Sequence, residues 1–481
     1  MRQFVLAALF HGVAVAAGAQ SGAIERVDTF VRAEMERSNI PGVAVAVIDK
    51  GQIVVAKGYG YANLEHGVAV GTNTVFQSGS VGKQFTATAV MALVDEGKIG
   101  LDDPLTQYFP TAPLAWRSIT VRHLLTHTSG MSDYEEPEES PAVFDYRRDY
   151  TEEELAELAF ASKLEFPSGS RWSYCNMGYI LLGIIIRKAS GQFYGDVLRD
   201  KVFVPLGMKS ARVISEEDIV LHRAAGYRLS SGTLKNQEWV SPSLNTTADG
   251  TLYLSIQDLI AWSKGLREGR ILTAASWEQT YSPVVLKSGS RYPYGFGWFV
   301  DSFNGQPRLH HDGGWQGFAS YISRDLGPDL TVIVLANAAH ADPERLGIGI
   351  AGAYLPALAP LPAAPVAEVP EARQRLESLL KQTSEGQLSP IELAYVKNGF
   401  FPSVAARYRS RLASLGNPLQ VSLMEHSVKG DDRIFVYELR YASLTLTATL
   451  GLAPDGKVSV FALRPKQAPF GIIEEILGGR P

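Results

Sequence analysis

The sequence has a single cysteine, Cys175, among its 481 residues. No disulfide can form within one chain, so the fold has to be stabilised by its hydrophobic core. A lone cysteine usually packs as a small apolar side chain, and we interpret Cys175 in this way.

The chain also lacks a strong charge and, beyond its N-terminus, a long apolar run. Its net charge is only −5, which gives no basic surface for a nucleic acid or an anionic membrane. No later segment reaches the roughly 18 consecutive apolar residues of a membrane span. With 46% hydrophobic and 20% charged residues, the composition is typical of a soluble globular protein, and the length favours two or three domains.

The N-terminal residues have the pattern of a secretory signal peptide. Met1 and Arg2 precede two apolar stretches, 4–10 and 14–17, that end in Ala17-Gly18-Ala19. We expect residues 1–19 to be removed and the protein to be exported, to the periplasm or outside the cell. A buried N-terminal helix is the alternative. Gln20 follows the cleavage point, where a lipidated protein would have cysteine.

The first chemical signal is Ser80-Val81-Gly82-Lys83, which precedes an apolar run, residues 85–94. Residues three positions apart share one face of a helix. A lysine in a partly dry pocket can accept the proton of a serine hydroxyl. Ser80 is therefore a candidate nucleophile and Lys83 a candidate base. The similar Ser378-Leu379-Leu380-Lys381 lies in an amphipathic stretch that we interpret as a surface helix.

Two further motifs follow in order, Tyr174-Cys175-Asn176 and His311-Asp312-Gly313-Gly314. Together the three motifs resemble the penicillin-recognising serine hydrolases. The match is to the branch of class C β-lactamases, D-aminopeptidases, D,D-peptidases and related esterases, whose second motif is Tyr-x-Asn. Three other segments are similar to that family, namely 119–131, 205–208 and 294–298. The resemblance covers roughly residues 22–340 and not the C-terminal quarter.

The resemblance implies roles for the motif residues. Ser80 would form an acyl-enzyme, while Lys83 and Tyr174 would move the proton from the hydroxyl to the leaving group. The backbone N–H groups of Ser80 and Gly314 would form the oxyanion hole. Three residues would contact the substrate, namely Asn176, His311 and Gly313.

No cofactor or metal is implied. His123 and His127 have the i, i+4 spacing of metal ligands on a helix. No third ligand accompanies them, so we expect structural roles for both.

His311 bears on the substrate, because family members that bind a substrate carboxylate usually have lysine at this position. Histidine is mostly neutral at pH 7. We therefore favour a peptidase or amidase that acts on small peptides. The alternatives are a carboxylesterase, a β-lactamase and a penicillin-binding sensor that acylates without turnover. A small-molecule or peptide substrate is the expected partner, and the oligomeric state stays open.

An acidic segment follows the stretch 119–131. If it overhangs the cleft, it would favour cationic substrates; the alternative is a solvated acidic loop. Its acidic residues are Asp133, Glu135, Glu136, Glu138 and Glu139.

The resemblance also implies the α/β plus all-α fold of β-lactamases and transpeptidases over residues 20–355, an antiparallel sheet flanked by helices with a helical subdomain. β-rich runs at 43–48 and 53–59 flank a turn, and runs at 318–322 and 330–335 would be the last strands of the same sheet. Start and stop signals predict helices at 80–97, 152–163 and 176–190.

The C-terminal quarter has a different pattern. A stretch rich in proline and alanine, 356–370, is typical of a semi-rigid linker. Residues 371–481 predict a small α+β domain, with two or three helices before strands such as the alternating run 444–450. Asp455-Gly456 would supply a hairpin turn. A cystatin-like helix on a curved sheet is one candidate architecture, and the domain carries no chemical motif.

Overall fold

The computed structural model describes residues 21–134, 144–361, 366–466 and 474–477. The predicted signal peptide, residues 1–19, lies outside these ranges. Among the helices of the described residues, none combines the length and hydrophobicity needed to cross a bilayer.

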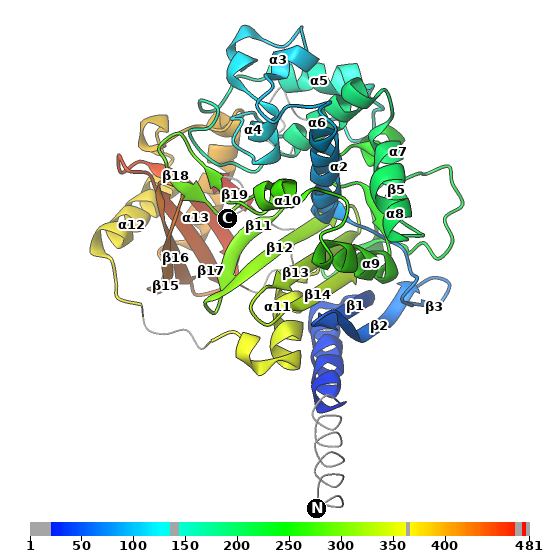
Figure 1. The fold of residues 1–481 in the computed structure, drawn as a ribbon. Coiled ribbons are helices and arrows are strands. Elements are labelled where there is room, and N and C mark those ends of the chain that lie inside the picture. The colour runs from blue at the N-terminus through cyan, green and yellow to red at the C-terminus, as the bar shows by residue number, and fades with distance from the viewer. Residues whose placement is uncertain (1–20, 135–143, 362–365, 467–473, 478–481) are drawn as a thin grey trace, which may run out of the picture.

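A seven-stranded antiparallel sheet forms the centre of the larger part of the molecule (Figure 1). The first strand of the sheet in chain order pairs with the last one in chain order, and Val43 lies opposite Ala336. This confirms the single sheet expected from the N-terminal and late strand-like runs. In spatial order the strands are β11 (Phe299–Phe303), β12 (Gln306–Trp315), β13 (Phe318–Asp325), β14 (Leu330–Ala336), β1 (Gly42–Asp49), β2 (Gln52–Asn63) and β3 (Val68–Ala69).

Alternation along β1 explains why helices cover both faces of this sheet. The valines Val43, Val45 and Val47 join a cluster built with the N-terminal helix, residues 21–38, and α11 (Pro343–Tyr354). The intervening Ala44 and Ala46 join the main core on the other face. Successive side chains of a strand point to opposite faces, so a strand with two apolar sets has to be buried on both sides.

Helices fill the chain between β2 and β11, and their ends follow local signals. Thr151 forms a capping box at the start of the predicted helix 152–163, which ends at Ala161. The helix predicted at 176–190 has those bounds and ends before Gly191 in the left-handed conformation. The predicted 80–97 helix opens with a 3-10 turn, Gly79–Gly82, and is α-helical only from Lys83 to Asp95.

The α-helices of this region are α2 (Lys83–Asp95), α3 (Leu105–Tyr108), α4 (Val121–Leu125), α5 (Glu152–Ala161), α6 (Asn176–Ser190), α7 (Tyr194–Leu198), α8 (Val204–Leu206), α9 (Ile256–Arg267) and α10 (Ala274–Thr280). Short strands lie among them: β4 (Phe76–Gln77), β5 (Arg212–Val213), β6 (Tyr227–Ser230), β7 (Thr233–Asn236), β8 (Leu252–Leu254), β9 (Val284–Val285) and β10 (Arg291–Tyr292).

The C-terminal quarter is a small α+β domain with a hydrophobic core of its own. Leu376 and Leu379 from its first helix pack with Tyr437, Leu450 and Phe461 from its sheet. The sheet is a five-stranded antiparallel meander. Its elements are α12 (Pro370–Glu385), α13 (Ala405–Leu415), β15 (Gln420–Lys429), β16 (Asp432–Arg440), β17 (Thr445–Leu452), β18 (Val458–Pro465) and β19 (Glu474–Leu477).

Several predictions for this quarter can be compared with the structure. The alternating run 444–450 lies in β17, and Gly456 turns the chain into β18 with φ +79°. Ser378 and Lys381 lie on the amphipathic surface helix α12, as expected. In the stretch 356–370, a 3-10 turn, Pro356–Leu358, is the last regular element before α12 begins at Pro370 within the described residues. A cystatin-like identity stays a prediction.

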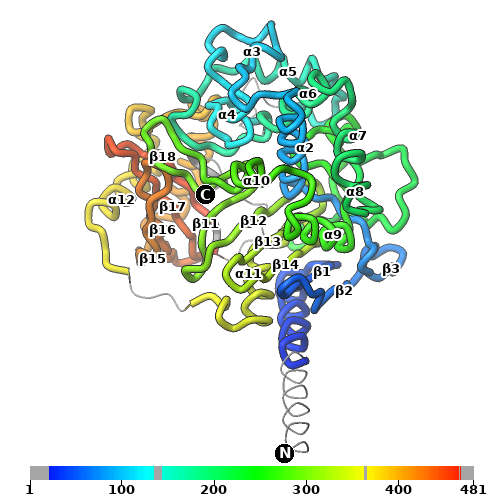
Figure 2. The backbone as a smooth tube through the Cα atoms, in the orientation of Figure 1, coloured from blue at the N-terminus to red at the C-terminus, as the bar shows by residue number. Residues whose placement is uncertain are grey.

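The C-terminal domain is packed against the larger part of the chain (Figure 2). The β15–β16 turn contacts the segment around β10, where the Gly430 N–H donates to the Arg291 carbonyl over 3.1 Å. Asp432 pairs with Arg171 at 3.2 Å. Arg171 lies three residues before Tyr174. Arg291 is adjacent to Tyr292, whose ring stacks on Trp172, so both contacts of the C-terminal domain lie near Tyr174.

Candidate active site

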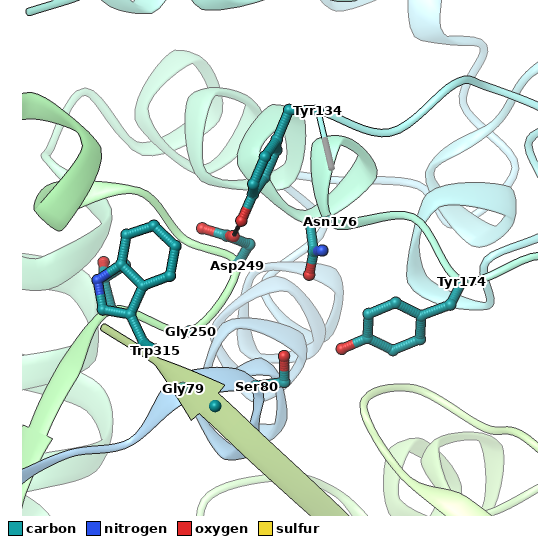
Figure 3. Close-up of a pocket in the computed structure, with 10 residues that line it drawn as sticks. Gly79, Ser80, Tyr134, Tyr174, Asn176, Asp249, Gly250 and Trp315 are labelled. Atoms are coloured by element: carbon teal, nitrogen blue, oxygen red, sulfur yellow. Dashed lines mark hydrogen bonds between the residues drawn. The ribbon is translucent and has the colours of Figure 1, made fainter. Parts of the chain in front are cut away.

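The three sequence motifs meet at one pocket (Figure 3). The 3-10 turn before α2 carries Ser80, the N-terminus of α6 carries Asn176, and the end of β12 carries Gly314. A loop before β8 closes the wall. The lining residues are Gly79, Ser80, Tyr134, Tyr174, Asn176, Asp249, Gly250, Thr251, Gly314 and Trp315.

Lys83 is fully buried and makes three polar contacts. Its Nζ lies 3.0 Å from Ser80 Oγ, 2.7 Å from Asn176 Oδ1 and 2.5 Å from the carbonyl oxygen of Asp249. The amide and carbonyl oxygens can only accept, so each takes one N–H of the amine. The third direction faces the Ser80 hydroxyl, and in a neutral amine this is where the lone pair lies. The geometry therefore suits Lys83 to receive the serine proton.

Figure 3 shows the hydroxyl of Tyr174 directed toward Ser80. The centre of its ring is 4.9 Å from Lys83 Nζ. The ring also packs against His127, at a centroid distance of 4.2 Å. A phenol in this position can exchange a proton with either Ser80 or a leaving group in the pocket.

The end of β12 lies directly against the turn that carries Ser80. A Cβ atom on Gly79, whose φ is +50°, would lie 2.4 Å from the Gly314 nitrogen. A Cβ atom on Gly313 would lie 2.7 Å from the Ser80 nitrogen. Only glycine permits this approach, and it brings the two N–H groups of the expected oxyanion hole to one side of the pocket.

His311 is buried, 1% exposed, and is not among the residues that line the pocket. Its Nδ1 lies 2.6 Å from the Asp312 carbonyl, which can only accept, so Nδ1 carries the proton. Burial lowers the pKa of His311 to about 4, so the ring is neutral and Nε2 accepts from Tyr294 Oη at 3.0 Å. The direct substrate contact expected of His311 stays a prediction that this geometry does not support.

The same hydrogen-bond chain continues to His127. With the Tyr294 hydroxyl donating to His311, its oxygen accepts from His127 Nε2 at 3.1 Å. His127 Nδ1 then accepts from the Cys175 N–H at 3.1 Å. Burial holds the pKa of His127 well below its usual value. Each proton in this hydrogen-bond chain can therefore be assigned to one atom. The two neutral histidine rings lie against the ring of Tyr174.

This chain predicts a pH dependence of stability. Both histidines have lowered pKa values in the folded protein, so the unfolded chain binds more protons between pH 6.5 and about 4. Their contribution is fully present above pH 6.5 and is lost as pH falls through that window. We expect the cost of His311→Asn, measured as the difference in Tm from wild type, to be largest at pH 7 and to shrink toward pH 4. A cost that is independent of pH would contradict a neutral His311.

Asp133 is a site residue whose role the sequence did not reveal. It is buried, 7% exposed, and its carboxylate accepts from the Asn176 N–H and Nδ2 at 3.0 Å and from the Met177 N–H at 3.1 Å. It thereby caps α6 and turns Asn176 Oδ1 toward Lys83. Asp133 is buried, so it belongs neither to an overhanging acidic loop nor to a solvated one. The other members of that segment, Glu135, Glu136, Glu138 and Glu139, lie outside the described residues.

Asp249 is the second missed residue, and its carboxylate belongs to the pocket wall. Oδ2 accepts from Tyr134 Oη and Oδ1 from Thr247 Oγ1, both at 2.6 Å (Figure 3). The side chain is 6% exposed, and no cation pairs with it among the described residues. A negative charge is therefore fixed beside Ser80. No sequence motif marks it, although Asp249-Gly250 before a strand is a turn signal that places polar groups at a loop.

The two histidines with metal-ligand spacing have other partners. Thr120 N–H donates to His123 Nδ1 at 3.1 Å and closes the capping box of α4. His127 faces the opposite way, in the chain with Tyr294. Across the residues that the structure describes, no group of three or more histidine, cysteine or acidic side chains could hold a metal ion.

A family model described as Beta-lactamase matches residues 27–354. The chain belongs to the beta-lactamase family. This is the penicillin-recognising serine hydrolase family that the motifs resemble, and it confirms the fold class expected from them. Within the beta-lactamase family, penicillin-binding protein 4* of Bacillus subtilis (strain 168) is 30% identical over 316 residues, which are 63% of this chain and 69% of the relative.

Two solved structures extend the comparison. D-amino acid amidase from Ochrobactrum anthropi SV3, complexed with L-phenylalanine amide, matches with a TM-score of 0.57 and 26% identity, over 66% of this chain and 91% of the amidase. The octameric penicillin-binding protein homologue from Pyrococcus abyssi matches with a TM-score of 0.60 and 25% identity, over 92% of this chain and 95% of its own. The second match includes the C-terminal domain as well as the beta-lactamase fold.

Proposed function

We propose that this protein is an exported serine hydrolase that cleaves amide bonds of small substrates with a free amino group, through an acyl-enzyme on Ser80. The observation that carries the proposal is the orientation of Lys83. Two acceptor-only oxygens take N–H groups of its amine, and the third direction meets Ser80 Oγ at 3.0 Å. A buried lysine held in this way is suited to accept the proton of Ser80, and this arrangement favours a catalytic role over a structural one.

Acylation follows from these positions. Ser80 Oγ attacks the carbonyl carbon of the substrate as its proton passes to Lys83 Nζ. The N–H groups of Ser80 and Gly314 stabilise the negative oxygen of the tetrahedral intermediate. Tyr174 gives its phenolic proton to the leaving amine and recovers a proton from Lys83, so the C–N bond breaks without releasing an amide anion. Asn176 keeps Lys83 in place and orients the substrate.

Deacylation reverses the roles. Water attacks the ester carbon, and its proton passes through Tyr174 or Lys83 to Ser80 Oγ as the C–O bond breaks. The carboxylic acid leaves and the resting hydroxyl is restored.

Two features of the site favour substrates with a free amino group. His311 is neutral at pH 7 and buried, so it offers no positive charge to the carboxylate of a penicillin or a peptide C-terminus. Asp249 places a negative charge in the pocket wall, which suits an ammonium group. The similarity to an amidase whose structure holds an amino acid amide points in the same direction.

The proposal is tested with a fluorophosphonate probe, mass spectrometry and five chromogenic substrates. These are alanyl p-nitroanilide in both configurations, its N-acetyl derivative, p-nitrophenyl acetate and nitrocefin. We expect the probe to label the peptide that contains Ser80, and the free amine to be hydrolysed fastest. Turnover of p-nitrophenyl acetate alone would indicate an esterase. Turnover of nitrocefin would indicate a β-lactamase. Labelling without any turnover would indicate a sensor.

Asp249→Asn tests the amine preference separately. The substitution keeps the shape of the side chain and its contact with Tyr134 but removes the charge. A charge-assisted hydrogen bond contributes about 1.5–3 kcal/mol. We therefore expect the ratio of kcat/KM for alanyl p-nitroanilide over its N-acetyl derivative to fall by roughly 10- to 100-fold. An unchanged ratio would contradict recognition of the amine by Asp249.

A further inference from the structure

Through Asn398, a segment of the C-terminal domain reaches Ser132, two residues before Tyr134 in the wall of the catalytic pocket. Its Nδ2 donates to Ser132 Oγ and, over 2.9 Å, to the Lys163 carbonyl. Its backbone N–H donates to Glu165 Oε1 over 3.1 Å. Ser132 Oγ in turn donates to the same carboxylate oxygen over 3.3 Å. Asn398, Ser132 and Glu165 therefore form a closed triangle in which each hydrogen bond has a defined direction.

The three consecutive residues 132–134 link this triangle to the site. Ser132 is held by Asn398, and its carbonyl accepts from Cys175 Sγ at 3.6 Å. Asp133 holds Asn176, the partner of Lys83. Tyr134 holds the carboxylate of Asp249. The backbone between adjacent residues is short and stiff, so a shift at Ser132 has to be shared by the next two positions.

Asn398 is itself fixed to the C-terminal domain. In its segment, the Ala394 N–H donates to the Val458 carbonyl of β18 over 2.8 Å. Leu393 and Phe400, on either side, are buried in the core of that domain. The ring of Tyr395 packs against the ring of Phe166 of the larger domain, with a distance of 5.4 Å between the ring centroids. The contact with Ser132 therefore transmits the position of the whole C-terminal domain.

We propose that Asn398 is a positioning residue for the hydrolytic site, and that the C-terminal domain completes this site by holding residues 132–134. The proposal rests on the proposed function of Ser80 but adds a part of the chain that carries no catalytic motif. The domain acts through Asp133 and Asn176, so its contribution is to the rate of acylation. Asp249, the proposed contact for the substrate amine, is held by Thr247 Oγ1 as well as by Tyr134, so we expect a smaller effect on substrate affinity.

A second contact across the same interface provides a matched control. Ser290 Oγ donates to Asp431 Oδ1 over 2.5 Å. Like the side chain of Asn398, it joins the two domains by hydrogen bonding, but it leads to the β9–β10 turn. Ser290→Ala therefore loosens the interface without disturbing residues 132–134.

The test compares full-length wild type, Asn398→Ala, Ser290→Ala, Ser132→Ala and the double variant Asn398→Ala/Ser132→Ala. Small displacements of catalytic groups cost about 10- to 100-fold in rate. We expect Asn398→Ala to lower kcat and the rate of Ser80 labelling about tenfold, with KM changed little. We expect Ser290→Ala to keep the wild-type rates, and the double variant to be no slower than the slower single variant.

Hydrogen exchange at the Asn176 and Met177 amides gives a readout that does not depend on hydrolysis. These N–H groups donate to Asp133, so they should exchange faster in Asn398→Ala and at the wild-type rate in Ser290→Ala. Equal effects of the two variants, or additive effects in the double variant, would overturn the proposal. Failure of wild-type Ser80 to react with the probe would instead overturn the proposed function, and the exchange rates would still decide the role of Asn398.

Discussion

Replacing Ser80 by alanine is expected to abolish turnover, with a loss in kcat on the order of 10⁵-fold. The substitution removes the hydroxyl that lies 3.0 Å from Lys83 Nζ and carries the proton that the lysine is proposed to accept. The fluorophosphonate adduct should vanish from the mass spectrum. The side chain is small and its removal leaves the backbone of the turn unchanged, so circular dichroism and Tm should change little.

Ser378→Ala supplies the matched control, because Ser378 and Lys381 repeat the Ser-x-x-Lys spacing on the surface helix α12. Lys381 is exposed there, whereas Lys83 is buried. Ser378→Ala should keep full labelling and turnover. Equal labelling of wild type and Ser80→Ala would show that the nucleophile lies elsewhere.

The parts of the fold that the sequence predicted are those set by local chemistry. Thr151 and Gly191 mark helix ends because a hydroxyl caps free N–H groups and glycine adopts positive φ without strain. The predicted start of α2 was less accurate, because the turn from Gly79 to Gly82 is shaped by its contact with β12. That contact joins residues more than 200 positions apart, and no local pattern reports it.

The site shows the same division. Ser80, Lys83, Tyr174 and Asn176 belong to short motifs, and the structure brings them together around one pocket. Asp133 and Asp249 act through partners 43 and 115 residues away. Their roles depend on tertiary contacts, so the acidic residues of the sequence alone did not show that Asp133 is buried and holds Asn176. Burial of His311 is likewise a tertiary property, and the sequence could only assign it an average pKa.

Gly313→Ala is expected to lower kcat by at least about 100-fold. The added Cβ would lie 2.4 Å from the Ser78 carbonyl oxygen, 2.6 Å from Ser320 Oγ and 2.7 Å from the Ser80 nitrogen. Two of these atoms are backbone, so β12 has to move away from the turn that carries Ser80. That movement separates the Ser80 and Gly314 N–H groups, and loss of one oxyanion donor costs roughly 10²- to 10³-fold. Labelling kinetics and turnover measure the loss.

Gly178→Ala separates this geometric effect from a general cost of replacing glycine near the site. Gly178 lies on α6 two residues after Asn176, and its added Cβ would meet neighbours only at 3.6 Å or more. Alanine is preferred to glycine inside a helix by about 1 kcal/mol, so this variant should keep its activity and gain slightly in Tm. A folded Gly313→Ala protein that acylates as fast as Gly178→Ala would show that the oxyanion hole tolerates a displaced β12, and that the close approach of the two glycine-containing segments serves packing alone.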